Sequence, residues 1–249
     1  KQAGFTLGTV ALAGFTLRHD GAATPLCWNS VTASVVLFDL PNTSKMQFTG
    51  NGCPVGSGTM TVLVPKGTAL FEGSLANFTG NLVLSNKLTQ FTSATLTEIG
   101  AAGKTNTIHT LAAETPLTAS SPVTFKGGLD IVESPKTNVT RFSFAKPTAF
   151  NGPVEIKNQA HSFYFEGGGA LTFTGGIRND AQTVFVGPQN WNGGATTNVI
   201  SGGAVSLGGS FYICNSVLRL SAPVTAAKVF AGYYTLALVC EADNLFENV

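Results

Sequence analysis

The sequence repeats itself at a step of about two dozen residues, and this repeat restricts the fold more than any other feature. The segment RFSFAKPTAFNGPVEIKN, which starts at Arg141, aligns with SFYFEGGGALTFTGGIRN, which starts at Ser162, so that Phe142 matches Phe163. Looser copies follow, beginning at Thr183, Ser210 and Tyr233. Self-similarity at such a period is the signature of a solenoid, in which each repeat forms one coil of a stack.

The amino-terminal half repeats as well, with strand-like patterning inside each copy. SVVLFDLPN aligns with MTVLVPKGT so that Val36 matches Val62. Apolar and polar residues alternate in segments such as MTVLV and FYFEG, which is typical of strands with one buried face. The string AGFTL occurs at Ala3 and again at Ala13. This spacing makes about one strand plus one turn, so the two copies are expected on neighbouring faces of a first coil or in a hairpin of an ordinary sandwich.

These patterns predict an all-β chain folded as a single-stranded parallel β-helix, or β-solenoid. The copies predict coils of about 21–26 residues, each with three short strands. An antiparallel β-sandwich or a jelly roll is the alternative, and it differs by lacking a repeat period. We expect residues 1–249 to form one β-solenoid domain, which could belong to a longer chain.

Composition excludes several classes of protein. Only 11% of residues are charged, 43% are hydrophobic and 18 are Phe, which argues against disorder. The net charge is +1 and the Lys and Arg residues are scattered, so we expect no nucleic-acid partner. No apolar run approaches the roughly 18–20 residues that span a bilayer, so we expect no membrane insertion.

The four cysteines have matching spacings. Cys27 and Cys53 are separated by the same step along the chain as Cys214 and Cys240, and this step equals the one between Val36 and Val62. Stacked strands lie about 4.8 Å apart, within reach of a disulfide. We therefore predict two disulfides, Cys27–Cys53 and Cys214–Cys240, one near each end of the solenoid. Four buried free thiols are the alternative, and four cysteines allow three pairings.

Residues for catalysis or metal binding are sparse. The close carboxylate pairs are Asp130 with Glu133 and Glu241 with Asp243, and charge clusters of this kind usually lie on solvated turns or ends. The three histidines have no carboxylate or cysteine at ligand or triad spacing. The sequence therefore predicts no catalytic residues, no metal site and no cofactor.

One segment could bind sugars. Trp191 lies in PQNWNGG, and an indole exposed on a turn there could stack on a sugar ring, with Asn190 and Tyr212 as further candidate glycan-binding residues. The alternative is a Trp side chain that covers the apolar floor of its own loop.

The copies NFTGNLVLSN and LTFTGGIRN point to a known family. They resemble the autotransporter-associated strand repeats and related β-helical passenger domains of large secreted bacterial surface proteins. This resemblance implies a parallel β-helix with an extracellular, usually non-catalytic, adhesive or structural role. It supplies no catalytic residues.

We therefore expect a secreted or cell-surface structural protein, a β-helical coat, stalk or filament subunit that associates with itself or with other surface proteins. No charged residue lies between Lys1 and Arg18, so the first strands are expected to be covered by another subunit or by more chain. A carbohydrate-binding adhesin, a polysaccharide lyase or hydrolase and a capsid-like jelly-roll protein are the alternatives.

Overall fold

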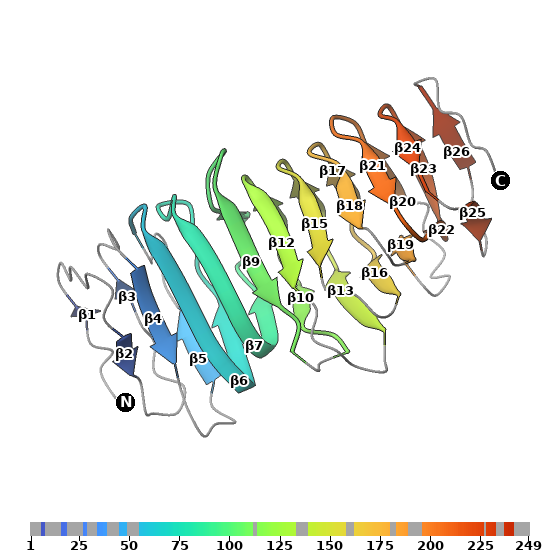
Figure 1. Ribbon diagram of the computed structural model, residues 1–249. Coiled ribbons are helices and arrows are strands. Elements are labelled where there is room, and N and C mark those ends of the chain that lie inside the picture. The colour runs from blue at the N-terminus through green and yellow to red at the C-terminus, as the bar shows by residue number, and fades with distance from the viewer. Residues whose placement is uncertain are drawn as a thin grey trace.

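The computed structural model is a parallel β-solenoid whose coils carry short strands on three faces (Figure 1). The structure describes residues 6–7, 16–18, 27–28, 34–38, 45–48, 55–111, 114–132, 139–157, 162–179, 183–188, 196–226, 228–232 and 237–241. Every strand pair in this part of the chain is parallel, which rules out the antiparallel alternative. These residues form no helix, so none is long and apolar enough to cross a membrane.

Faces 1 and 2 form one continuous sheet. They are joined because β6 (Thr59–Phe71) and β7 (Asn81–Phe91) run around the corner between them. The other strands of face 1 are β2 (Thr16–Arg18), β4 (Ser34–Phe38), β9 (Thr105–His109), β12 (Gly128–Val132), β15 (Val154–Lys157), β18 (Ile177–Asn179), β21 (Val205–Leu207) and β24 (Val224–Thr225). Those of face 2 are β5 (Lys45–Phe48), β10 (Leu117–Ala119), β13 (Thr140–Phe144), β16 (Phe163–Glu166), β19 (Val184–Val186), β22 (Ser210–Cys214) and β25 (Lys228–Gly232).

Face 3 is a separate seven-stranded sheet. Its strands are β8 (Thr97–Ile99), β11 (Val123–Phe125), β14 (Thr148–Phe150), β17 (Leu171–Phe173), β20 (Thr196–Ile200), β23 (Ser216–Leu220) and β26 (Ala237–Cys240). The chain visits the faces in a fixed order, for example β9, β10 and β11 and then β12, β13 and β14, so each coil lies on the previous one. Near the amino terminus β1 (Thr6–Leu7) and β3 (Cys27–Trp28) form a two-stranded sheet.

The described residues of the two AGFTL copies, Thr6–Leu7 in β1 and Thr16–Leu17 in β2, lie in different sheets. β1 pairs with β3, whereas β2 pairs with β4, so the copies form neighbouring strands of the coil path and not a hairpin with each other. This confirms the solenoid interpretation of that repeat. The other residues before Arg18, for which we predicted a covering subunit or further chain, lie outside the described residues.

Coil length varies more than the sequence predicts. The step between paired positions is shortest where Ser210 lies beside Lys228, and it is much longer where Ile177 lies beside Val205. The first of these steps falls below the predicted range of coil lengths and the second exceeds it, so that range is too narrow. Within each of these two strand pairs the register is constant, so the extra residues of the long coil lie between strands, at the corners. The pairing of β6 with β7 differs, because its register shifts between Val64 and Thr68.

Two sequence alignments are corrected by the strand register. Phe142 lies beside Phe165 and not Phe163, because this coil is two residues longer than the alignment assumed. Val36 lies beside Thr61 and not Val62, a shift of one residue. A shift of two keeps a side chain on the same side of the strand, whereas a shift of one moves it to the other side.

Columns of inward-facing apolar residues fill the interior of the solenoid. On face 3, Phe125, Phe150 and Phe173 stack with ring centroids 5.2 and 4.6 Å apart and nearly parallel planes. On face 2, Phe48 and Phe71 stack in the same way at 4.6 Å. All five rings are fully buried. The alternation seen in the sequence is therefore the alternation between this core and the exterior, as in the burial of every second residue along β6 and β7.

Candidate functional site

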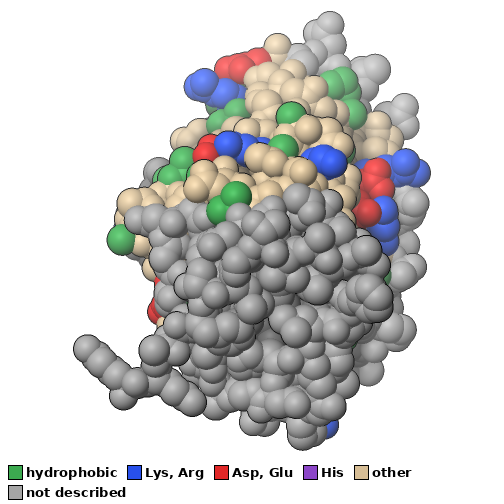
Figure 2. Space-filling view, turned by 90° about the vertical axis from the view of Figure 1, so that its left-hand side faces the viewer, with side chains coloured by type: hydrophobic (Ala, Val, Ile, Leu, Met, Phe, Trp, Pro, Cys, Tyr) green, Lys and Arg blue, Asp and Glu red, His purple; other side chains and the backbone are tan. Residues whose placement is uncertain are grey.

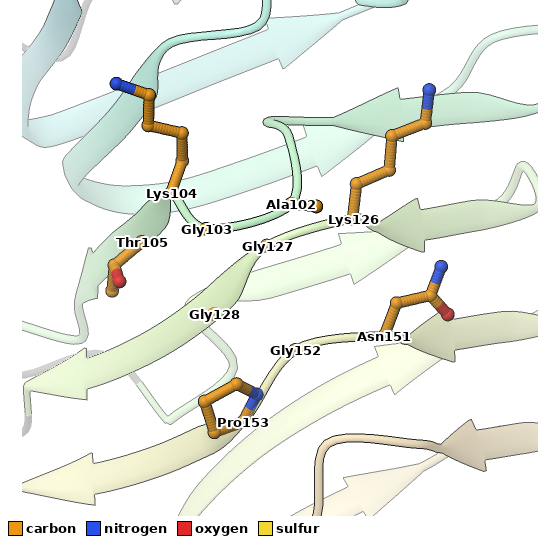
Figure 3. Close-up of a pocket in the computed structure, with 10 residues that line it drawn as sticks. All are labelled: Ala102, Gly103, Lys104, Thr105, Lys126, Gly127, Gly128, Asn151, Gly152 and Pro153. Carbon is orange, nitrogen blue, oxygen red and sulfur yellow. The ribbon is translucent and has the colours of Figure 1, made fainter. Parts of the chain in front are cut away.

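A cavity of about 270 Å³ opens at the corner where face 3 passes into face 1 (Figure 3). We call it the corner cavity. Three successive coils contribute three residues each to its lining, and Ala102 adds to the first. These residues are Gly103, Lys104 and Thr105, then Lys126, Gly127 and Gly128, then Asn151, Gly152 and Pro153. The pairing of β9 with β12 and of β12 with β15 holds the three triplets in register.

Two glycines of the middle coil, Gly127 and Gly128, leave part of the space that forms the cavity. Gly128, at the start of β12, lies beside Thr105 of β9. The next residue, Leu129, pairs with Val154, which follows Pro153. A Cβ at Gly128 would meet Thr105 Oγ1 at 3.3 Å and the Pro153 carbonyl oxygen at 3.5 Å, which is close to ordinary contact. Gly128 therefore leaves a space on the exterior that a side chain would partly fill.

Glycines also let the coils approach closely at this corner. A Cβ at Gly127 would lie 2.2 Å from the Lys104 carbonyl oxygen, and one at Gly152 would lie 2.4 Å from the main chain of Gly127. The same crowding recurs above them, where a Cβ at Gly175 would lie 2.0 Å from the carbonyl carbon of Gly152. Only glycine fits these positions, and the floor of the cavity is therefore bare main chain.

Two lysines make the corner cavity cationic. The Lys126 ammonium lies 2.9 Å from Glu98 Oε2, whereas Lys104 is exposed and has no ion-pair partner among the described residues. Figure 3 shows Lys104, Lys126 and Asn151 around the glycine main chain and Pro153 on the opposite side, with the two lysine side chains extending away from each other. Two ammonium groups against one carboxylate leave an excess of one positive charge. Such a site can attract one anionic group, and the Asn151 amide and the Thr105 hydroxyl can form hydrogen bonds with the rest of the same ligand.

A charged cluster lies further along the exterior of face 1. Asp130 and Glu155 occupy neighbouring positions on β12 and β15, and Lys157 Nζ lies 2.6 Å from Asp130 Oδ2 and 3.3 Å from Glu155 Oε2. The hydrogen bond to Asp130 raises the pKa of Lys157. One lysine therefore neutralises two carboxylates on adjacent coils. Glu133, which forms a close pair with Asp130 in the sequence, falls outside the described residues.

The exterior of face 2 carries a stack of aromatic rings. Tyr164 and Phe185 lie 4.1 Å apart between ring centroids, and Phe185 and Tyr212 lie 4.5 Å apart, in both cases face to face. The guanidinium of Arg141 lies over the outer face of Tyr164 at 4.3 Å and also bonds Glu166 at 3.0 Å. Burial is the main reason that the pKa of Tyr164 is raised.

This stack limits what Tyr212 can do as a candidate sugar-binding residue. One face of its ring is covered by Phe185, and its position on β22 lies beside Phe230 on β25. A sugar stacks on the face of a ring, and Phe185 occupies one of the two faces that Tyr212 could offer. Trp191 and Asn190, the other two candidates, lie outside the described residues.

The predicted Cys214–Cys240 disulfide is wrong. Cys214 is a free, buried thiol. It lies on face 2 beside Gly232, whereas Cys240 lies on face 3 beside Leu220. The coils at this end are shorter than the spacing between the two cysteines, so that spacing carries the chain past one corner. Cys53 lies outside the described residues, and with it the predicted Cys27–Cys53 bond.

Glu241, from the second carboxylate pair of the sequence, forms an ion pair with Arg219. Glu241 lies 3.2 Å from Arg219 Nε and accepts a hydrogen bond from Ser221, while its predicted neighbour Asp243 lies outside the described residues. Within the described ranges no group of three or more His, Cys, Asp or Glu side chains could hold a metal ion.

Sequence reasoning did not single out the residues of the corner cavity. One signal that could have indicated this corner is the GG dipeptide that precedes strands of face 1 at Gly127, Gly175 and Gly202, although GG also occurs at Gly167, Gly193 and Gly208. No protein-family model, curated protein or solved structure matches this chain.

Proposed function

We propose that this chain is a non-catalytic structural β-solenoid of a secreted or cell-surface protein, which serves as a coat, stalk or filament subunit. The observation that carries the proposal is that its exterior carboxylates are used to join coils. Asp130 and Glu155 share Lys157, and Glu114 and Glu166 share Arg141, each set spanning neighbouring coils. Figure 2 likewise shows acidic and basic side chains next to each other on the described part of one face.

An enzyme that cleaves polysaccharides needs a different arrangement. Glycoside hydrolysis uses one carboxyl group as an acid and a second as a nucleophile or base, so the two need different environments. Asp130 and Glu155 instead contact the same ammonium group. Their side chains are also 25% and 38% exposed, outside any enclosed site. This geometry favours a structural role over an acid–base role.

The interior supports the same role. Parallel strand pairing links successive coils in the described part of the chain, and stacked Phe rings add side-chain contacts between some of these coils. Self-association would extend this pairing, because the edge of a parallel sheet can accept a strand from another chain. The resemblance to β-helical passenger domains is in keeping with a surface location.

Two measurements test the proposal. Light scattering over a concentration series should show mass increasing with concentration, and electron microscopy should show elongated particles. In parallel, a panel of neutral and acidic polysaccharides should keep its chain length after incubation with the protein. Depolymerisation that is lost in Asp130→Asn would contradict the non-catalytic role, and a constant monomer mass would contradict the filament and coat assignments.

A further inference from the structure

We propose that the corner cavity binds one acidic sugar unit of a polysaccharide, with the exposed ammonium group of Lys104 as the partner of its carboxylate. This inference depends on the proposed function in one respect, because a surface location is what would bring the protein into contact with such polymers. The site itself is argued from its own geometry.

The size of the cavity suits one sugar unit. Pockets for drug-sized ligands are about 300–1,000 Å³. The corner cavity, at about 270 Å³, is just below that range, so it can take a single ring or a small anion. The cavity is partly open to solvent, which leaves room for the rest of a polymer to continue outside it.

The charge at the cavity suits one carboxylate. Lys126 is partly neutralised by Glu98, whereas Lys104 has no acidic partner in the described part of the chain. The excess of one positive charge matches the single negative charge of an acidic sugar. Because Lys104 is exposed and Lys126 is only half-buried, we expect the attraction to be modest and to weaken with salt.

The remaining lining suits the uncharged part of a sugar. The Asn151 amide and the Thr105 hydroxyl can exchange hydrogen bonds with sugar hydroxyl groups, and the Pro153 ring supplies a small apolar surface. The glycine floor adds main chain that no side chain covers, so a ligand can approach it closely. The cavity thus combines hydrogen-bond donors, hydrogen-bond acceptors and apolar surface from three successive coils.

The proposal is tested by titrating the protein with trigalacturonate and following backbone amide signals of Gly103, Gly127 and Gly128 by NMR. Maltotriose is the neutral control of equal length, and sodium sulfate is the control for a free anion. We expect trigalacturonate to shift these signals with an affinity that falls as salt is added. Maltotriose should leave the signals unchanged.

Three variants separate the cavity from general surface charge. Lys104→Gln should weaken binding about two- to fivefold, as loss of one exposed charge contact implies. Gly128→Val fills the space beside Thr105 and should weaken binding by about tenfold or more, since it takes the place of the ligand. Lys87→Gln removes an exposed lysine elsewhere and should change affinity by less than about twofold.

Three results would overturn the inference. They are equal binding of maltotriose, equal effects of Lys104→Gln and Lys87→Gln, and binding of free sulfate to the same signals as tightly as trigalacturonate. Lys104→Gln alters only an exposed side chain, so it decides the matter even if Gly128→Val disturbs folding. Shortening of trigalacturonate during the titration would refute the non-catalytic function while leaving the binding site in place.

Discussion

Replacing Gly152 by alanine should strongly destabilise the solenoid, although it adds a single methyl group at the surface. That Cβ would lie 2.4 Å from the carbonyl carbon of Gly127 and 2.4 Å from the nitrogen of Gly128. Ordinary contact begins near 3.4 Å, so two coils must separate by about 1 Å. The neighbouring hydrogen bond from the Leu129 N–H to the Pro153 carbonyl, now 2.9 Å, would then be stretched.

These terms give a magnitude. Overpacking costs about 1–3 kcal/mol, and loss of one main-chain hydrogen bond costs about 1 kcal/mol. We therefore expect Gly152→Ala to lower the free energy of unfolding by about 2–4 kcal/mol. Gly128→Ala is the matched control, because its Cβ would be only slightly too close to one side-chain atom, Thr105 Oγ1 at 3.3 Å, and alanine is favoured over glycine in a strand. It should change stability by less than about 1 kcal/mol.

Urea unfolding followed by circular dichroism measures both variants under the same conditions. Because solenoids can unfold in parts, hydrogen exchange at Leu129 and Val154 gives a local readout of the same corner. Equal losses of stability in the two variants would refute the argument, since the substitutions differ only in the space that the coils leave. A loss below about 1 kcal/mol in Gly152→Ala would do the same.

Three further predictions follow from other parts of the solenoid. Phe150→Ala removes a fully buried ring that stacks on two others and should cost about 3–5 kcal/mol in urea unfolding, well above the cost of Phe185→Ala on the exterior. Burial raises the pKa of Cys214 from 9.0 to about 11, so the unfolded chain loses this proton first and stability should fall between those pH values; Cys214→Ala should remove that slope, and a thiol reagent should react with wild-type Cys214 only after unfolding. Lys157→Met should leave two facing carboxylates without their shared cation and lower stability by up to about 1 kcal/mol, more at low salt than at high salt, as measured by thermal melting.

The parallel, three-faced coil could be predicted from the sequence, whereas the exact register could not. Phe142 and Phe163 align well by eye, yet Phe142 lies beside Phe165. All three rings face the core, so a shift of two residues leaves the burial pattern intact and the sequence holds no penalty against it. Corner residues set coil length, and they carry little pattern of their own.

The same limit explains the errors at the candidate sites. The matched spacing of Cys214 and Cys240 suggested that the two cysteines occupy equivalent positions on neighbouring coils. The coils at that end are shorter than this spacing, so the cysteines lie on different faces. The corner cavity is formed by what Gly128 lacks, between Thr105 and Pro153, and an absent side chain becomes informative only when its spatial neighbours are known. Pattern therefore predicted the core, and three-dimensional placement was needed for the surface.

The variable coil length has a practical consequence. Strands from short coils and from long coils stack with the same parallel pairing, so the scaffold accepts added chain where one face turns into the next. A foreign peptide epitope spliced into such a turn should be displayed to solvent while the strands on either side keep their partners. Several epitopes placed at successive turns would form an evenly spaced row, with the spacing fixed by the distance of about 4.8 Å between neighbouring strands.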